Sequence, residues 1–233
     1  MTSTPVALIT GASRGLGLAL ARSLSPRGWR LILDGRDPAR LGAVADALPG
    51  AVTIAGTVTD PRHREALATA VDVLGRLDLV VNNASELGPS PLPNLADHPL
   101  EALRTVYETN VIAPIALLQL TLPALRRSGG TVLDVSSDAA VEAYPGWGGY
   151  GSSKAALDQV TAVLAVEEPA LRVYAVDPGD MRTDMHQRAF PGEDISDRPT
   201  PEDVVPALLR LLDVAPASGR YRASEWAPVE VPR

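Results

Sequence analysis

Tyr150 and Lys154 are the two side chains of this sequence whose types and spacing best suit acid–base chemistry. They stand four residues apart at the start of a predicted helix, which places them on one face. A free tyrosine titrates near pH ~10, so it exchanges protons poorly at neutral pH. An ammonium about 4 Å away contributes roughly 4 kcal/mol at an effective dielectric constant of about 20. We therefore expect Lys154 to lower the pKa of Tyr150 toward about 7, where general acid–base groups work best.

A tyrosine and a lysine with this spacing more often lie exposed on a helix surface without a function. Other residues of the sequence must therefore support a catalytic role. Ser137 lies thirteen residues before Tyr150, just beyond a predicted strand, and its hydroxyl could hydrogen-bond a reacting carbonyl. Asn82 and Asn83 end another predicted strand, where a turn and a cofactor wall are both reasonable. Open α/β sheets bind ligands at this edge, where their strands end. Asn110 interrupts an apolar helical segment, so its amide is expected to have a partner.

Three glycines stand between the first predicted strand and the first predicted helix, at Gly11, Gly15 and Gly17. Glycines here allow a tight turn and a close backbone approach, and the free N–H groups at the helix start attract a diphosphate. The spacing is Gly-x-x-x-Gly-x-Gly, which differs from the Gly-x-Gly-x-x-Gly pattern of many dinucleotide sites. The motif indicates a dinucleotide site, and an ordinary strand-to-helix turn is the alternative.

An arginine follows the second predicted strand, in the sequence Asp34-Gly35-Arg36-Asp37. In an adenosine-binding fold, a carboxylate at this strand end binds both ribose hydroxyls, whereas an arginine favours a 2′-phosphate. We place Gly35 at the discriminating position, so that Arg36 and Arg14 of the glycine turn clamp the phosphate. A shift by one residue would put Asp34 there and favour NAD(H), and both arginines could simply be solvated. The sequence therefore predicts NADP(H) as the preferred cofactor, with NAD(H) possible.

Short apolar strands alternate with helices along the whole chain. The predicted strands span residues 6–10, 30–33, 51–55, 77–82, 131–136, 171–177 and 219–222, and the predicted helices span 16–24, 38–48, 61–74, 100–128, 150–167 and 201–212. Pro114 and Pro123 should bend or divide the helix at 100–128. Strands this apolar indicate a parallel sheet that is buried on both faces. We expect an α/β fold: one domain, residues 1–233, with a doubly wound parallel sheet of about seven strands and helices on both faces.

Composition and charge argue against several other classes of protein. The 233 residues, 45% apolar and 21% charged, fit one large globular domain. A net charge of −7 argues against a nucleic-acid surface, which needs a basic face. The sequence has no cysteine, and its three histidines share no ligand spacing, so no metal site is expected. No apolar run approaches the ~20 residues of a membrane span, and the start, residues 1–5, is too short for a signal peptide, so we expect a cytoplasmic protein.

Residues 184–200 are predicted to be the one long irregular insertion late in the chain. Loops of this length often act as lids or binding loops. Met185 and Phe190 suggest an apolar lid without defining a substrate. Trp147 is expected either to border the pocket or to pack elsewhere, and His186 to be a solvated loop histidine.

The sequence resembles the short-chain dehydrogenase/reductase family across nearly its whole length. Six spaced motifs in the family's order carry the resemblance: Thr10-Gly11-x-x-x-Gly15-x-Gly17, Asn82-Asn83-Ala84, Asn110, Ser137, Tyr150-x-x-x-Lys154 and Pro178-Gly179-x-x-x-Thr183. Three departures stand out. Ser85 and Thr57 replace a usual glycine and a common aspartate, and residues 226–233 lack the usual glycine-rich ending, which puts tetramer packing in doubt.

The resemblance implies a catalytic role for each of four residues. Tyr150 would be the general acid in reduction and the base in oxidation, and Lys154 would hold the nicotinamide ribose and lower the pKa of Tyr150. Ser137 would orient the substrate oxygen, and Asn110 would support a proton-relay water. The cofactor-binding residues that we expect are Gly11, Ser13, Arg14, Gly15, Leu16, Gly17, Arg36, Val58, Asn83, Ala84, Tyr150, Lys154, Pro178, Gly179 and Thr183.

The implied function is reversible hydride transfer between NADP(H) and a small-molecule carbonyl or secondary alcohol. The family also implies a homodimer or homotetramer, with helices 100–128 and 150–167 as the expected interface. The alternative is a non-catalytic dinucleotide-binding protein of the same fold, a redox sensor or scaffold, because a fold alone does not determine a function.

Overall fold

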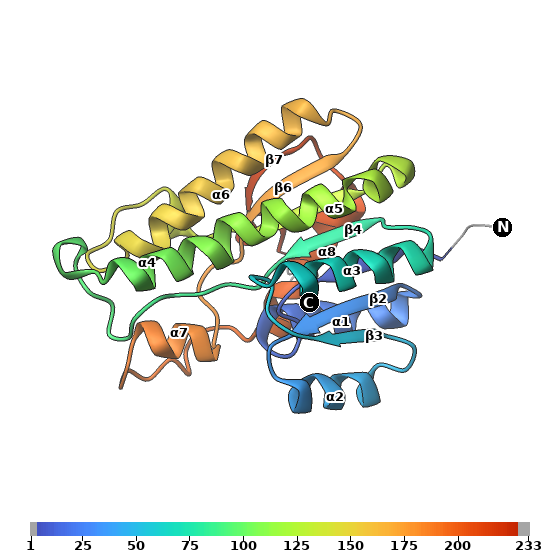
Figure 1. Cartoon of the computed structure of the whole chain (residues 1–233). Coiled ribbons are helices and arrows are strands. Elements are labelled where there is room, and N and C mark those ends of the chain that lie inside the picture. The colour runs from blue at the N-terminus through green and yellow to red at the C-terminus, as the bar shows by residue number, and fades with distance from the viewer. Residues whose placement is uncertain (1–3, 228–233) are drawn as a thin grey trace, which may run out of the picture.

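A parallel sheet of seven strands forms the centre of the computed structural model, which describes residues 4–227. Residues 1–3 and 228–233 lie outside the described residues, and so do the parts of the predictions for the start of the chain and for residues 226–233 that fall on them. The strands are β1 (Val6–Ile9), β2 (Arg30–Gly35), β3 (Val52–Ala55), β4 (Leu79–Asn82), β5 (Thr131–Val135), β6 (Arg172–Asp177) and β7 (Gly219–Arg222). Their order is β3-β2-β1-β4-β5-β6-β7, and every neighbouring pair is parallel (Figure 1). The predicted doubly wound fold is confirmed.

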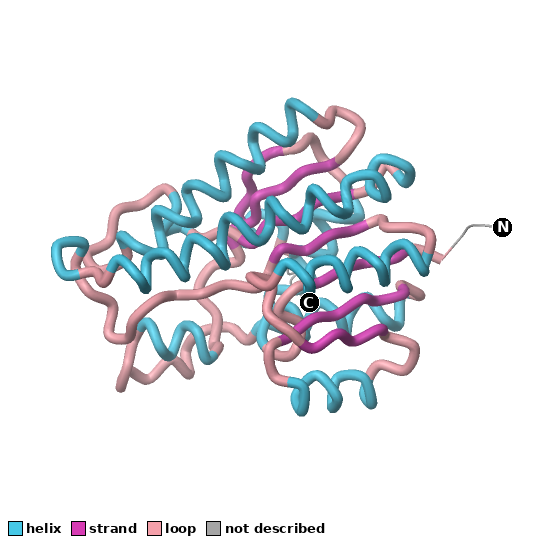
Figure 2. The backbone as a smooth tube through the Cα atoms, viewed as in Figure 1, coloured by secondary structure: helices cyan, strands magenta, loops and turns pink. Residues whose placement is uncertain are grey.

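Helices cover both faces of this sheet (Figure 2). One face packs against α1 (Gly15–Leu24), α2 (Pro38–Ala47) and α8 (Pro201–Val214), and the other against α3 (Pro61–Leu74), α5 (Ala113–Ser128) and α6 (Gly148–Glu167). Leu8, Ile32 and Val80 of the central strands are fully buried. Burial on both faces explains why the strands read as continuous apolar runs rather than as alternating patterns.

Side-chain caps determine where several helices begin. Asp37 and Asp60 accept hydrogen bonds from backbone N–H groups in the first turns of α2 and α3. Thr200 and Asp203 form a reciprocal capping box at the start of α8, which satisfies two N–H groups that have no partner inside the helix. The helix at α6 begins at Gly148 rather than at the predicted Tyr150.

The predicted helix at 100–128 is interrupted by one wide turn. It comprises α4 (Leu100–Tyr107), a π-helical turn (Glu108–Ile112) and α5. Within the wide turn, Ala113 N donates to the Glu108 carbonyl five residues earlier. Pro114 has no N–H with which to bond the Asn110 carbonyl. The interruption therefore lies just before Pro114, and Pro123 lies inside α5.

The same stretch, Leu100–Ser128, is long and apolar enough to cross a membrane by length and composition alone. This corrects the expectation that nothing in the chain approaches that length. Half of its apolar window is buried within the protein, and Leu117 and Leu125 pack in the core beside α3. A core helix meets the same criterion, so the observation is weak evidence for a membrane.

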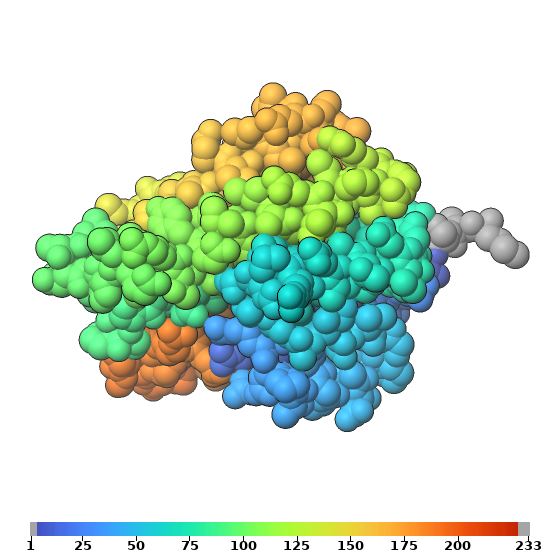
Figure 3. Space-filling model, viewed as in Figure 1, coloured from blue at the N-terminus to red at the C-terminus, as the bar shows by residue number. Residues whose placement is uncertain are grey.

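Residues 184–200, the segment predicted to be a lid and called the lid below, begin with a short helix, α7 (Asp184–Ala189), where an irregular segment was expected. The Thr183 side chain caps it by accepting a hydrogen bond from His186 N. The lid lies against the segment that follows β4 (Figure 3). Ser90 Oγ donates to the Arg188 carbonyl over 2.6 Å, and the Arg188 guanidinium donates to the Gly88 carbonyl over 2.9 Å.

Candidate active site

A cavity of about 710 Å³ opens where the strands of the sheet end, and the lid forms part of its wall. That volume lies in the usual range of small-molecule sites. The structure brings the following predicted site residues together around it: Gly11, Ser13, Arg14, Gly15, Leu16, Arg36, Val58, Asn83, Ala84, Ser137, Tyr150, Lys154, Pro178, Gly179 and Thr183. Of the predicted set, Gly17 and Asn110 lie behind the wall rather than in it.

The glycine turn sits directly against the segment that follows β4. Gly11 has φ +65°, and a Cβ there would come within 2.9 Å of the Ala84 backbone. A Cβ on Gly17 would come within 2.6 Å of Asn83 Nδ2, which donates to the Thr10 and Gly11 carbonyls. Gly17 therefore allows Asn83 to brace the turn. Any side chain at Gly11 or Gly17 would displace the loop that faces the cavity.

Asp34 lines the cavity, and both of its carboxylate oxygens already have partners within the protein. It is a buried residue of β2, and one carboxylate oxygen accepts a hydrogen bond from Gly11 N. The other oxygen lies 3.0 Å from His63 Nε2, which is also buried. Both oxygens are thus engaged inside the protein, and Arg36 is the first residue beyond the strand.

Three arginines line the part of the cavity beyond β2: the predicted Arg14 and Arg36, and also Arg40. Their present partners are acidic side chains. Arg14 pairs with Asp184, and Arg36 lies 3.4 Å from Glu86. Arg40 lies in α2, four residues after Arg36, and was not among the predicted cofactor-binding residues. Its short distance in sequence from Arg36 is the signal that could have identified it.

Asn110 lies in the π-helical turn and is fully buried. Its Oδ1 accepts from Glu86 N and Ser85 Oγ, and its Nδ2 donates to the Glu86 carbonyl and Ser153 Oγ, all within 2.7–3.1 Å. The Asn110 side-chain amide, which was expected to have a partner, therefore makes four hydrogen bonds. Because the side chain is saturated, any relay water would have to use the Asn110 carbonyl, which Pro114 leaves without its usual helical donor.

Tyr150 is buried, and burial raises the pKa of its phenol above the usual value. The carboxylates of Asp138 and Asp177 act in the same direction, whereas hydrogen bonds with Ser85 and Ser137 lower the pKa. The prediction that the pKa of Tyr150 is lowered toward 7 is therefore wrong for this structure. Ser85, noted above only as a departure from the family, proves to be a polar neighbour of the phenol.

Lys154 is the single lysine of the sequence, and it is almost completely buried. Its Nζ donates to the Val135 carbonyl over 2.7 Å and lies 5.6 Å from the centre of the Tyr150 ring. Burial lowers the pKa of Lys154 to about 8, although Asp134 and Asp158 raise it. The ammonium is thus held by a strand carbonyl and faces the Tyr150 ring, which explains why it does not dominate the pKa of the phenol.

A row of rings leads from Tyr150 toward the lid. Trp147 packs edge-on against Tyr150 at 5.7 Å and against Phe190 at 5.9 Å, and Phe190 packs on His186 at 4.8 Å, all between ring centres. His186 is buried, and within the described part of the chain its Nε2 has no hydrogen-bond partner. The expectation of a solvated histidine is therefore wrong, because α7 folds back onto the aromatic residues and covers it.

The residues present fit a dinucleotide. A glycine turn that has no room for a Cβ at Gly17 lies at the start of α1, where free N–H groups favour a diphosphate. The three guanidiniums beyond β2 supply positive charge at the adenosine end. Among residues 4–227, no group of three or more His, Asp or Glu side chains could hold a metal ion.

The short chain dehydrogenase family profile matches residues 5–194. The chain belongs to this family. An oxidoreductase of Schizosaccharomyces pombe is 32% identical over 185 residues, which cover 79% of this chain and 74% of that protein. The serine 3-dehydrogenase of Agrobacterium fabrum is 37% identical over 182 residues, covering 76% and 72%. The L-fucose dehydrogenase of Mus musculus is 32% identical over 184 residues, covering 78% and 67%.

Solved structures of this family superpose closely on the chain. A short chain dehydrogenase from Shigella flexneri has a TM-score of 0.88 at 30% identity, covering 98% of this chain and 93% of that one. A second Shigella flexneri protein of the family, complexed with NADP, has a TM-score of 0.88 at 31% identity, covering 94% and 97%. An alcohol dehydrogenase from Thermococcus sibiricus, complexed with 5-hydroxy-NADP, has a TM-score of 0.83 at 28% identity, covering 94% and 95%.

The buried ammonium of Lys154 should make the stability of this short-chain dehydrogenase depend on pH. Its folded-state pKa of about 8 lies below the unfolded value of about 10.4. The destabilisation is therefore complete below pH ~8 and is lost as the pH rises to ~10.4. Relative to Lys154→Met, the unfolding free energy of the wild type should rise by about 2–3 kcal/mol between pH ~7 and ~10.5. Urea denaturation of both proteins measures this, and a constant difference would contradict it.

Proposed function

We propose that this protein is an NADP(H)-dependent carbonyl reductase and alcohol dehydrogenase that uses Tyr150, Lys154 and Ser137. It acts as one cofactor-binding unit with residues 184–200 as its lid. The observation that carries the proposal is that these three side chains line the same cavity as the glycine turn and the arginines beyond β2. A phenol, an ammonium and a hydroxyl in a shared cleft are the parts that proton transfer to a carbonyl oxygen requires.

The state of Tyr150 favours reduction at neutral pH. Because burial raises the pKa of its phenol, the group stays protonated and can donate its proton to a developing alkoxide. The Ser137 hydroxyl donates to Asp138 Oδ1 and accepts from Ala139 N in this structure. On substrate binding it would turn to hold the same oxygen. Lys154 would place positive charge beneath the ring and bind the nicotinamide ribose. A bound NADPH supplies the hydride.

The arginines support a preference for NADP(H) over NAD(H). Arg14, Arg36 and Arg40 are each about half exposed or more. Asp184 and Asp37, the partners of Arg14 and Arg40, are also exposed, so these two pairs contribute little. Glu86, the partner of Arg36, is largely buried and is also bonded by Arg188. A phosphate dianion can replace such partners because guanidinium groups bind it through paired hydrogen bonds. Two structural relatives bound to NADP or a derivative of it also support the preference.

The substrate end of the cavity favours a carbonyl compound with an apolar substituent. Tyr150 belongs to a small apolar cluster with Leu87, against which Trp147, Met185 and Ala189 pack. Burying an apolar group here gains about 25 cal/mol for each Å² removed from water. The relatives named for serine and for L-fucose act on different substrates, so their names do not identify a substrate for this chain. The proposal therefore rests on the residues that line the cavity.

A redox sensor or scaffold of the same fold remains the second candidate. The buried His186 Nε2, which no described residue bonds, favours it, because a segment that repacks around this histidine can report cofactor binding without turnover. Tight NADPH binding without reduction of any ketone or aldehyde would support this alternative.

Replacing Tyr150 by Phe removes the proton donor and leaves the ring. We expect kcat for reduction of an aromatic ketone to fall roughly 10²–10⁴-fold, with the Kd for NADPH little changed in fluorescence titrations. Tyr221→Phe is the matched control, because its hydroxyl bonds the Ala217 carbonyl outside the cavity. Equal turnover in Tyr150→Phe and the wild type would exclude the proposed chemistry.

Replacing Arg36 by Ala tests the cofactor preference. Loss of a charged hydrogen bond to phosphate should raise the Kd for NADPH roughly 10–100-fold, while the Kd for NADH changes far less. Arg62→Ala, at the exposed start of α3, should affect neither cofactor. Equal losses for both cofactors would mean that Arg36 does not meet the 2′-phosphate.

We also propose that a second copy of this chain covers α4, α5 and α6, as the family's oligomers suggest. Large apolar side chains are exposed on these helices, including Leu100, Leu120, Val163 and Val166. Covering them would remove apolar surface from water, and it would account for the exposed half of the helix at Leu100–Ser128.

Charging this face should therefore separate the copies. We expect Leu120→Glu combined with Val163→Glu to lower the mass measured by light scattering to that of one chain. Val214→Glu, on the opposite face in α8 and also exposed, is the control and should leave the mass unchanged. A wild-type protein that is already monomeric at micromolar concentration would contradict the proposal.

A further inference from the structure

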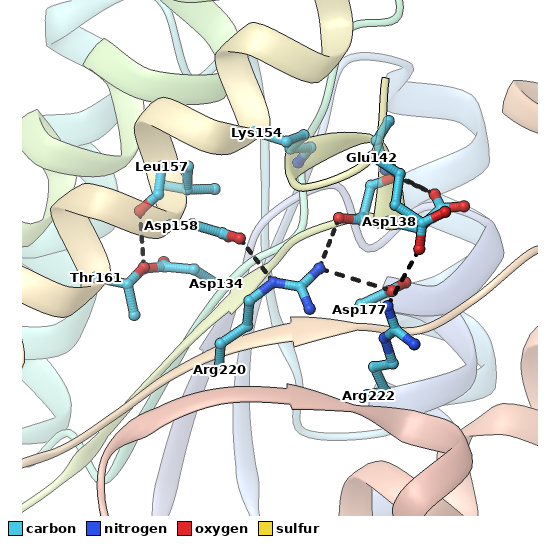
Figure 4. Close-up of polar contacts among 12 residues, drawn as sticks. Asp134, Asp138, Glu142, Lys154, Leu157, Asp158, Thr161, Asp177, Arg220 and Arg222 are labelled. Carbon is cyan, nitrogen blue, oxygen red and sulfur yellow. Dashed lines mark hydrogen bonds and ion pairs between the residues drawn. The ribbon is translucent and has the colours of Figure 1, made fainter. Parts of the chain in front are cut away.

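The Arg220 side chain extends from β7 toward Asp158 of α6 and Asp177 of β6, next to the candidate active site (Figure 4). Its Nε donates to Asp158 Oδ2 over 2.9 Å, and its terminal nitrogen donates to the Ser137 carbonyl over 2.9 Å. The same terminal nitrogen lies 3.7 Å from Asp177 Oδ2. Only about a quarter of the Arg220 side chain is exposed, so these contacts are largely shielded from water.

The three partners of Arg220 belong to the segments that carry the site. Ser137 follows β5, and its hydroxyl is the group proposed to meet the substrate oxygen. Asp158 stands one helical turn beyond Lys154 on α6. Asp177 ends β6, and its other oxygen accepts a hydrogen bond from Gly179 N in the cavity wall. One guanidinium therefore connects both sides of the proposed reaction centre and the wall beside it.

Arg220 also balances the charge around Lys154. Asp134 on β5 and Asp158 on α6 both raise the pKa of Lys154, and Asp138 and Asp177 act on Tyr150. Asp134 is buried and is bonded by Asn82 and Thr161. Asp158 Oδ1 is buried and has no hydrogen-bond partner among residues 4–227, so the charge of Asp158 depends on Arg220 for its compensation. A buried carboxylate that loses its cation is strongly unfavourable.

We propose that Arg220 is a positioning residue of the reaction: it holds the Ser137 backbone and neutralises Asp158, so that the Ser137 hydroxyl and the Lys154 ammonium keep their places and charges around Tyr150. The inference rests on the roles proposed above for Ser137 and Lys154. Arg222, two residues further along β7, gives a contrast. It is about half exposed and lies 3.2 Å from the similarly exposed Glu142, an arrangement that contributes little.

Because Lys154 is the single lysine of the chain, protein labelled with ¹³C at lysine Cε gives one side-chain NMR signal that reports its titration without any turnover. We expect a midpoint near pH 8 in the wild type. In Arg220→Gln the uncompensated Asp158 should raise the midpoint by about half a pKa unit or more, and Asp158→Asn should lower it similarly. Arg222→Gln is the control and should leave the midpoint in place.

Steady-state kinetics test the hold on Ser137. Arg220→Gln should lower kcat about 10-fold or more, with the Kd for NADPH unchanged, while Arg222→Gln should match the wild type. The double variant Arg220→Gln/Asp158→Asn should return the Lys154 midpoint toward the wild-type value yet keep the low kcat, because nothing then holds the Ser137 carbonyl. Should Arg220→Gln fail to fold, Arg220→Lys keeps one cationic donor and should retain part of kcat.

The outcomes separate this inference from the proposed function. A wild-type midpoint and a wild-type kcat in folded Arg220→Gln, or a wild-type kcat in Arg220→Lys, would overturn the inference. If Tyr150→Phe is inactive at the same time, the proposed function still stands. A shifted midpoint in Arg220→Gln, in a protein whose wild type reduces no carbonyl, would support the electrostatic role of Arg220 and overturn the function. A kcat that recovers fully in the double variant would overturn the hold on Ser137.

Discussion

The burial of one ammonium group, that of Lys154, is the constraint around which the site is built. A charge this far from water is tolerated only with hydrogen bonds and opposite charges nearby. The Val135 carbonyl supplies the first, and Asp134 and Asp158 supply the second. Those acids then need partners of their own, and Asn82, Thr161 and Arg220 provide them. The charge of Lys154 in the cavity wall is thus balanced by acids on β5 and α6, and the acid on α6 is balanced in turn by Arg220 on β7, the last strand of the sheet.

The same burial sets the state of the phenol. A tyrosine removed from water keeps its proton more firmly, and two nearby carboxylates strengthen that effect. Hydrogen bonds with Ser85 and Ser137 oppose it. The result is a neutral acid beside a cationic lysine, a combination suited to giving a proton to an oxygen that gains negative charge. The protonation state of this phenol therefore follows from solvation as much as from the four-residue spacing.

The cofactor end depends on close backbone packing instead. Gly11 and Gly17 leave no space for a Cβ, which lets Asn83 bond to the carbonyls of the turn. Asp34 completes the arrangement by accepting from Gly11 N while its second oxygen meets His63. The turn is held from β4 and from β2 at once, at the point where the strand order reverses. Such a crevice is where open α/β sheets bind their ligands.

The order of strands and helices, the glycine turn and the Tyr150–Lys154 pair could all be predicted from the sequence, because each depends on residues close together in the chain. Local periodicity also located nearly every element, and Pro114 marked where the helix at 100–128 is divided. The main error was α7, where an irregular segment was expected. The rest depended on contacts between distant residues. Four features arise only when the elements pack: the raised pKa of Tyr150, the bonding of Asp34 to Gly11 and His63, the burial of His186, and the contact of Arg220 with Ser137, 83 residues away in sequence. Tertiary packing determines which polar groups are buried away from water and which charged groups come into contact. Neither can be predicted from a local sequence pattern.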